Sequence, residues 1–172
     1  MLKLDKYLNL KTKHGTVVRV VREHYLRKDV PCNNELCNKF CNKGLDCIPS
    51  NVSHILIPDC FVARTFAEIL DLPELRGLLF LQTVLHSALH DGSRRTYNRL
   101  LGKVHDGKSG CAIFANEFCE DIYALQESGE KLEDWQFRLV FRSAEWYFSH
   151  LDKQKPIIIL TENKEVSPLF SL

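Results

Sequence analysis

The sequence predicts an α/β fold in which a parallel sheet is flanked by helices. Short apolar runs with the length of buried strands recur from residue 54 onward, and segments of helical periodicity separate them. Strands that alternate with helices favour parallel pairing, because each helix returns the chain to the same end of the sheet. The expected buried strands are Ile55–Ile57, Leu78–Leu81, Cys111–Phe114 and Pro156–Thr161.

The segments between these strands carry apolar residues at helical spacing. We expect helices over Phe61–Leu70, Val84–Leu89, Arg94–Val104, Glu117–Ala124 and Leu132–Leu151. The last of them is the longest periodic segment, and its apolar residues face roughly one way. Sites in parallel sheets form at the carboxyl ends of the strands, so the polar residues that follow the strands are expected at the functional edge.

The N-terminal part of the chain has a different composition. Thr16–Arg22 is rich in β-branched residues, which predicts a strand or an extended arm. Lys28–Asn51 has the composition of a long loop and contains four of the seven cysteines. They are Cys32, Cys37, Cys41 and Cys47, and their spacing suggests thiolate ligation of zinc, with His24 as an alternative ligand. Reduced thiols without a metal are the other interpretation.

Charge and hydropathy exclude several classes of protein. The 23 Lys and Arg residues nearly balance the 22 Asp and Glu residues, which gives no support for tight RNA binding by this chain alone. No signal-peptide core and no apolar stretch of membrane-spanning length is present. We therefore expect a soluble intracellular protein with reduced thiols and no membrane partner.

A set of motifs resembles one known family. Val21–Arg27 precedes the cysteine cluster, and Ile57–Asp59, Leu81–Leu85 and Phe114–Glu117 follow in the family's order. From about Val20 to Asn163 the chain is similar to the N-terminal PIN region of the Dis-three family of exosome ribonucleases, most of all to the cytoplasmic Dis-three-like exonuclease. The resemblance implies a PIN-like fold. It also implies three parts: an N-terminal arm with a cysteine-rich exosome-docking element (residues 1–53), the PIN-like domain (54–163) and a truncated or atypical tail (164–172).

The same resemblance implies an acidic site for Mg²⁺ or Mn²⁺ that this chain has mostly lost. Two-metal hydrolysis of RNA needs several carboxylates that converge on the ions. The four family positions hold Asp59, Ser87, Phe137 and Asn163, so one carboxylate remains. Asp134, one helical turn before Phe137, and Glu162 are the possible replacements, although strand alternation predicts that Glu162 faces away. On its local sequence alone, Asp59 is a helix N-cap or a loop carboxylate.

These features predict a degenerate PIN module that tethers a 3′→5′ exoribonuclease of the RNase II type to the core ring of the cytoplasmic RNA exosome. RNA would be bound and degraded by further domains of the parent enzyme, which lie outside these 172 residues. One alternative is a residual metal-dependent endoribonuclease that uses Asp59, Asp134 and Glu162. Another is a free-standing interaction domain stapled by zinc. Because the family continues with further sheet and helix after the last predicted strand, we also expect an open sheet edge and marginal stability.

Overall fold

The centre of the molecule is a small parallel sheet. In the computed structural model, which describes residues 7–11, 17–21, 25–39, 41, 44 and 46–162, β3 (Ile55–Pro58) pairs with β6 (Ile157–Leu160). β4 (Leu79–Leu81) pairs with β5 (Ala112–Phe114) in the same parallel sense. A parallel bridge between Leu56 and Leu78 joins the two pairs in the order β6–β3–β4–β5. The predicted α/β class and the parallel direction of the strands are confirmed.

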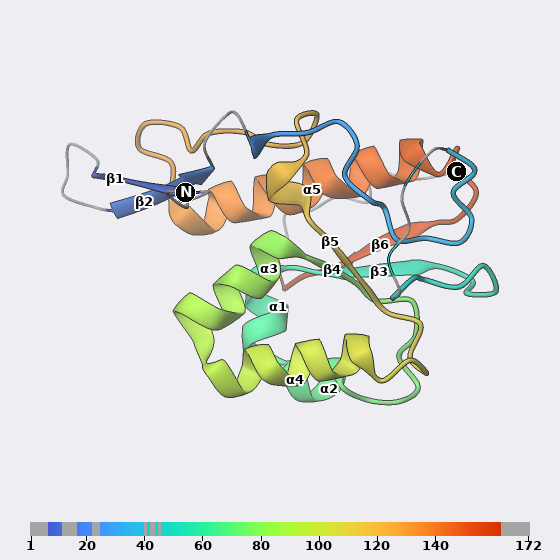
Figure 1. Cartoon of the computed structure of the whole chain (residues 1–172). Helices are drawn as coiled ribbons and strands as arrows, with labels where there is room; N and C mark the ends of the chain where they lie inside the picture. The colour runs from blue at the N-terminus through green and yellow to red at the C-terminus, as the bar shows by residue number, and fades with distance from the viewer. Residues whose placement is uncertain are drawn as a thin grey trace, which may run out of the picture.

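Helices lie on both sides of these strands (Figure 1). The long helix α5 (Leu132–His150) runs along one side, and α2 (Ala67–Leu70) and α4 (Arg94–His105) lie on the other. α3 (Gln82–Ser87) starts directly after β4 and continues into a π-helical turn, η2 (Ala88–Gly92). Within the described part of the chain, no helix has the length and apolar character needed to cross a membrane.

Two predicted helices differ in the structure. The expected helix over Phe61–Leu70 is broken at Phe66, which separates α1 (Cys60–Thr65) from α2. The expected helix over Glu117–Ala124 was wrong, since only the 3-10 helix η3 (Asn116–Phe118) forms. The backbone around Cys119 pairs with Arg27 instead, through hydrogen bonds of 2.7 and 2.9 Å, so tertiary pairing overrides the local helical pattern.

The N-terminal arm forms a separate two-stranded ribbon. β1 (Tyr7–Lys11) pairs antiparallel with β2 (Val17–Val21), which confirms the strand expected in Thr16–Arg22 and adds one that was not predicted. The strand predicted over Pro156–Thr161 is present as β6, and its Ile158 is 43% exposed, in agreement with the expected open sheet edge. The tail 164–172 lies outside the described residues.

The cysteine-rich loop is part of the main hydrophobic core. Val30, Cys32, Cys37 and Ile48 are buried in the same cluster as the sheet residues. Asn33 fixes the loop to the sheet, because its side-chain amide donates to the carbonyl of Ile113 in β5 over 2.8 Å. The loop is therefore held by packing and hydrogen bonds in addition to any metal.

Candidate functional site

Three cysteines of the loop meet a histidine from the end of α5. The sulfur atoms of Cys32, Cys37 and Cys41 and a ring nitrogen of His150 all lie within 4.8 Å of one another. Nε2 of His150 is 3.2 Å from the sulfur of Cys37 and 3.3 Å from that of Cys41. In tetrahedral zinc sites, bond lengths of about 2.3 Å to sulfur and 2.0 Å to nitrogen place neighbouring ligand atoms about 3.5–3.8 Å apart. The donor set and its spacing fit zinc.

Aromatic stacking positions the histidine. The ring of His150 stacks on Trp146, with centroids 4.3 Å apart, and Trp146 stacks on Phe114 of β5 at 5.0 Å. Trp146 and His150 are four residues apart, so they share one face of α5. Opposite them, the hydroxyl of Tyr147 donates to the carbonyl of Cys32 over 2.5 Å and fixes the loop against the same helix.

The protonation of the cluster suits a soft divalent cation. Burial lowers the pKa of His150, and the neighbouring charge of Lys39 lowers it further, so the imidazole is neutral near pH 7 and offers a lone pair. Burial raises the pKa of the Cys32 and Cys41 thiols, so their thiolates need a bound cation to be stable here.

Two other residues named as possible zinc ligands are placed differently. Cys47 lies outside the cluster, and its sulfur donates to the carbonyl of Gly44 over 3.3 Å. His24 lies outside the described residues. His150 takes the fourth place, and it was missed because more than a hundred residues separate it from the cysteines and no spacing signal connects them.

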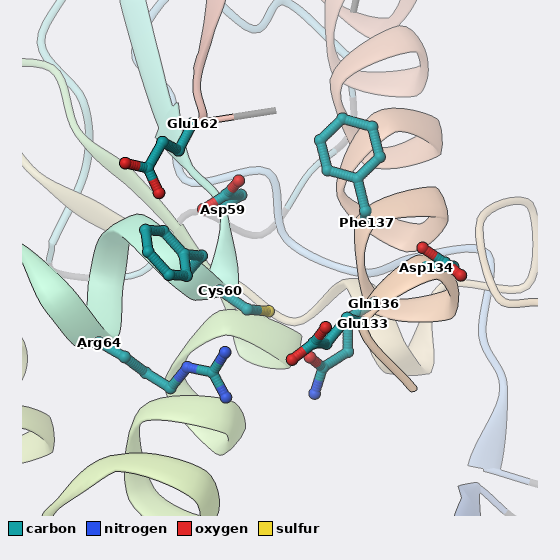
Figure 2. A pocket seen from close by; sticks show the side chains of 9 residues that line it. Asp59, Cys60, Arg64, Glu133, Asp134, Gln136, Phe137 and Glu162 are labelled. Atoms are coloured by element: carbon teal, nitrogen blue, oxygen red, sulfur yellow. The ribbon is translucent and has the colours of Figure 1, made fainter. Parts of the chain in front are cut away.

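Asp59, Asp134 and Glu162, the acidic residues named from the sequence, line a second site (Figure 2). This site is a cavity of ≈ 410 Å³ at the carboxyl ends of β3 and β6. Asp59 follows β3 directly and is 6% exposed. One of its carboxylate oxygens accepts from the backbone N–H of Val62 over 2.7 Å and caps α1, so the predicted N-cap is confirmed. The cavity is lined by Asp59, Cys60, Phe61, Arg64, Glu133, Asp134, Gln136, Phe137 and Glu162.

The structure brings together some of the predicted acidic residues. Asp59, Asp134 and Glu162 all line the cavity, so Glu162 does not face away as strand alternation suggested. In Figure 2, however, the carboxylate of Asp134 is directed away from Asp59. Glu133 adds a carboxylate that sequence reasoning missed, although it directly precedes Asp134 in the first turn of α5.

Two further positions that the resemblance assigned to the acidic site, Phe137 and Ser87, hold side chains without a carboxylate. The half-buried ring of Phe137 lines the cavity. Ser87 is not among the lining residues; it is buried, and its hydroxyl donates to Asp91 over 3.1 Å. Asn163 lies outside the described residues. Among the described residues, no three carboxylates lie close enough together to share an ion. The one group of ligand atoms that lies close enough is formed by Cys32, Cys37, Cys41 and His150.

A cysteine nucleophile is also excluded from this cavity. Burial raises the pKa of the Cys60 thiol to about 12, so it stays protonated near neutral pH. A protonated thiol is a poor nucleophile. The cavity therefore offers carboxylates, one guanidinium, an amide and aromatic rings, without a group poised for covalent chemistry.

Comparison with known proteins identifies relatives of the chain. No family model matches it. It is 30% identical over 181 residues to the exosome complex exonuclease RRP44 of Mus musculus, and 31% identical over 180 residues to that of Homo sapiens. These alignments cover 96% and 95% of this chain but 19% of each relative, so the chain spans about a fifth of the length of these proteins.

A solved structure shows the same fold. The RRP44 PIN domain of T. brucei superposes with a TM-score of 0.72 at 19% sequence identity, and the match covers 81% of each chain. The predicted PIN-like fold is confirmed by this likeness. The chain thus has the fold of a PIN domain and is similar in sequence to about a fifth of the length of the RRP44 exosome exonucleases.

Proposed function

We propose that this chain is a PIN module without endonuclease activity that tethers a 3′→5′ exoribonuclease of the RNase II type to the core ring of the cytoplasmic RNA exosome. The observation that carries the proposal is the acidic cavity. Phe137 presents an aromatic ring at the family position of a carboxylate ligand, and the described residues offer no three carboxylates able to share an ion. The related proteins are named exosome complex exonucleases, which supports the exosome as partner.

The loss of cleavage follows from charge and geometry. Two divalent ions about 4 Å apart repel each other strongly, and converging carboxylates must offset that repulsion. Here one oxygen of Asp59 is engaged in capping α1, and Asp134 points away from it. An aromatic ring supplies no oxygen to replace the lost ligand. The carboxylates of the cavity therefore do not converge as two bound ions require.

The cysteine-rich segment is the proposed docking element. Zinc held by Cys32, Cys37, Cys41 and His150 would tie the loop at residues 28–51 to the end of α5. Structural zinc contributes directly to folding free energy, and here it would add to the packing that already holds the loop against the core. A rigid loop presents its contact residues to the exosome at lower entropic cost than a flexible one.

The test combines zinc content with exosome binding. Native mass spectrometry of the 172-residue chain should find one zinc ion, and an immobilised chain should capture purified exosome core. We expect His150→Ala and Cys37→Ser to lose both zinc and capture. Cys47→Ser is the matched control, because Cys47 lies outside the cluster, and it should retain both. Zinc-independent capture would refute the docking role of the cluster, and a zinc-bound chain that captures no exosome would favour a free-standing interaction domain.

A residual endoribonuclease is the second candidate. It is favoured by one observation, namely that Asp59, Asp134 and Glu162 line the same cavity. A direct cleavage assay separates it from the tethering role.

A further inference from the structure

The negative charge of the acidic cavity is only partly balanced by positive charge in its lining. Four carboxylates line it, those of Asp59, Glu133, Asp134 and Glu162, against the single guanidinium of Arg64. Arg64 is itself drawn to Asp91, 3.7 Å away, which is not part of the lining. Glu133, Asp134 and Glu162 have no ion-pair partner among the described residues. The site therefore favours a cation and disfavours the phosphates of RNA.

Two buried polar groups in the cavity also lack a partner. Gln136 is 7% exposed and lines the cavity, and its side-chain amide has no hydrogen-bond partner among the described residues. Figure 2 shows this amide near Glu133, on the side of the cavity where Arg64 lies. The second oxygen of Asp59, which does not cap α1, is likewise without a partner in the described part of the chain. Each group therefore has an acceptor oxygen that a hydrogen-bond donor inside the cavity can use.

Aromatic rings supply the remaining surface of the site. Phe137 lines the cavity, and Phe61, which is 40% exposed, forms part of its lining. Phe61 packs edge-on against Phe66, whose ring centroid is 6.2 Å away and which is 36% exposed, so an apolar surface continues outward over α1. Aromatic faces attract organic cations and cover aliphatic stems, whereas a hydrated divalent metal ion gains little from them.

We propose that this cavity binds an arginine side chain presented by a protein partner, with an adjacent apolar residue of that partner lying over Phe61 and Phe66. A guanidinium has five N–H donors in one plane, so it can pair with carboxylate and amide oxygens of the lining while it stacks on an aromatic ring. An ammonium has a more compact charge with three donors and fits this spread of acceptors less well. The inference rests on the cavity and is independent of the zinc cluster.

The test is a titration of the 172-residue chain with a capped peptide, acetyl-Gly-Leu-Arg-Leu-Gly-amide, followed by backbone amide chemical shifts. We expect saturable binding with shifts concentrated around α1 and the first turns of α5. Replacing the arginine by citrulline, which keeps the shape and removes the charge, should weaken binding at least tenfold, and lysine should weaken it by a smaller factor.

Variants locate the binding in the cavity. Glu162→Gln and Gln136→Leu should each weaken binding of the arginine peptide about fivefold while leaving distant amide shifts unchanged. Glu145→Gln, an exposed carboxylate on α5 outside the cavity, is the matched control and should bind like the unaltered chain. Equal affinity for the citrulline peptide, or shifts located elsewhere, would overturn the proposal. Displacement of the peptide by 1 mM Mn²⁺ would identify a metal site instead, and displacement by a single-stranded RNA oligonucleotide would identify an RNA site.

Discussion

At the scale of single residues, Tyr147 connects the cysteine-rich loop to the longest helix. It is fully buried, and its hydroxyl donates to the carbonyl of Cys32. Burial raises the pKa of the phenol well above its ordinary value of 10, so the hydroxyl remains a donor across the physiological range. This bond sets the position of Cys32, the first residue of the Cys32, Cys37, Cys41 and His150 cluster, relative to α5, the helix that carries His150.

Removing that hydroxyl should destabilise the fold. We predict that Tyr147→Phe lowers the free energy of unfolding by about 1–3 kcal/mol, because it leaves a buried carbonyl without its donor. Urea unfolding followed by circular dichroism measures the change. Tyr97→Phe is the matched control, since Tyr97 is half-exposed, and it should change stability by less than about 0.5 kcal/mol. Equal effects of the two substitutions would show that the hydrogen bond of the Tyr147 hydroxyl does not stabilise the fold.

The residues of the metal cluster show how far single positions can be predicted. Cys32, Cys37 and Cys41 were identified from local spacing, because a loop that concentrates thiols has few other uses for them. His150 was not identified, since its place beside them depends on how α5 packs against the loop. Ligands within one segment leave a sequence signal, and ligands joined by tertiary packing do not.

At the scale of elements, a charged pair fixes the segment before α5 to that helix. Glu130 forms a bidentate pair with Arg138, with N···O distances of 2.9 and 2.7 Å. The same guanidinium donates to the carbonyl of Leu125 over 3.0 Å. Nearby, the indole N–H of Trp135 donates to the carbonyl of Ala124 over 2.8 Å. The start of α5, which carries the acidic residues of the cavity, is thereby held in place.

Breaking the pair of Glu130 and Arg138 should lower the free energy of unfolding by an amount that depends on pH. Hydrogen bonds from Arg138 lower the pKa of Glu130 below its ordinary value of 4.5. Its stabilising contribution is therefore present above about pH 4.5 and is lost as the pH falls through the lowered value. We predict that Glu130→Gln costs about 1.5 kcal/mol at pH 7 and progressively less below pH 4.5, as measured by urea unfolding at several pH values.

Glu127→Gln serves as the control for that experiment. The Glu127 side chain is 75% exposed and lies 3.8 Å from Arg138, so its loss should cost less than about 0.5 kcal/mol at any pH. If Glu130→Gln lowered the free energy of unfolding equally at every pH, packing and not charge would hold the segment before α5.

The elements that were predicted well are those with strong, local patterns. Apolar strands and the long periodic helix α5 appear where expected, because their burial is encoded in their own residues. The break at Phe66 and the extended backbone at Cys119 were not predicted. Both depend on partners distant in sequence or on side-chain packing, such as the pairing of Cys119 with Arg27.

At the scale of the whole molecule, the chain combines a PIN-like fold with a cavity that an aromatic ring helps to line. The sheet and its flanking helices form that fold, and Phe137 lines the cavity together with Asp59. A packed core depends on many residues, while metal-dependent chemistry depends on a few oxygen ligands. The sequence predicted the fold, but it contained no signal that the cysteine-rich loop shares the core of the sheet.

The central claim, a PIN fold without endonuclease chemistry, is tested most directly by incubating the 172-residue chain with circular RNA and Mn²⁺. Circular RNA has no ends, so only internal cleavage can open it. The comparison is Asp59→Asn, which removes the carboxylate charge but keeps an amide able to cap α1. We predict that neither protein linearises the RNA above the rate seen without protein. Mn²⁺-dependent cleavage by the unaltered chain that disappears in Asp59→Asn would contradict the account.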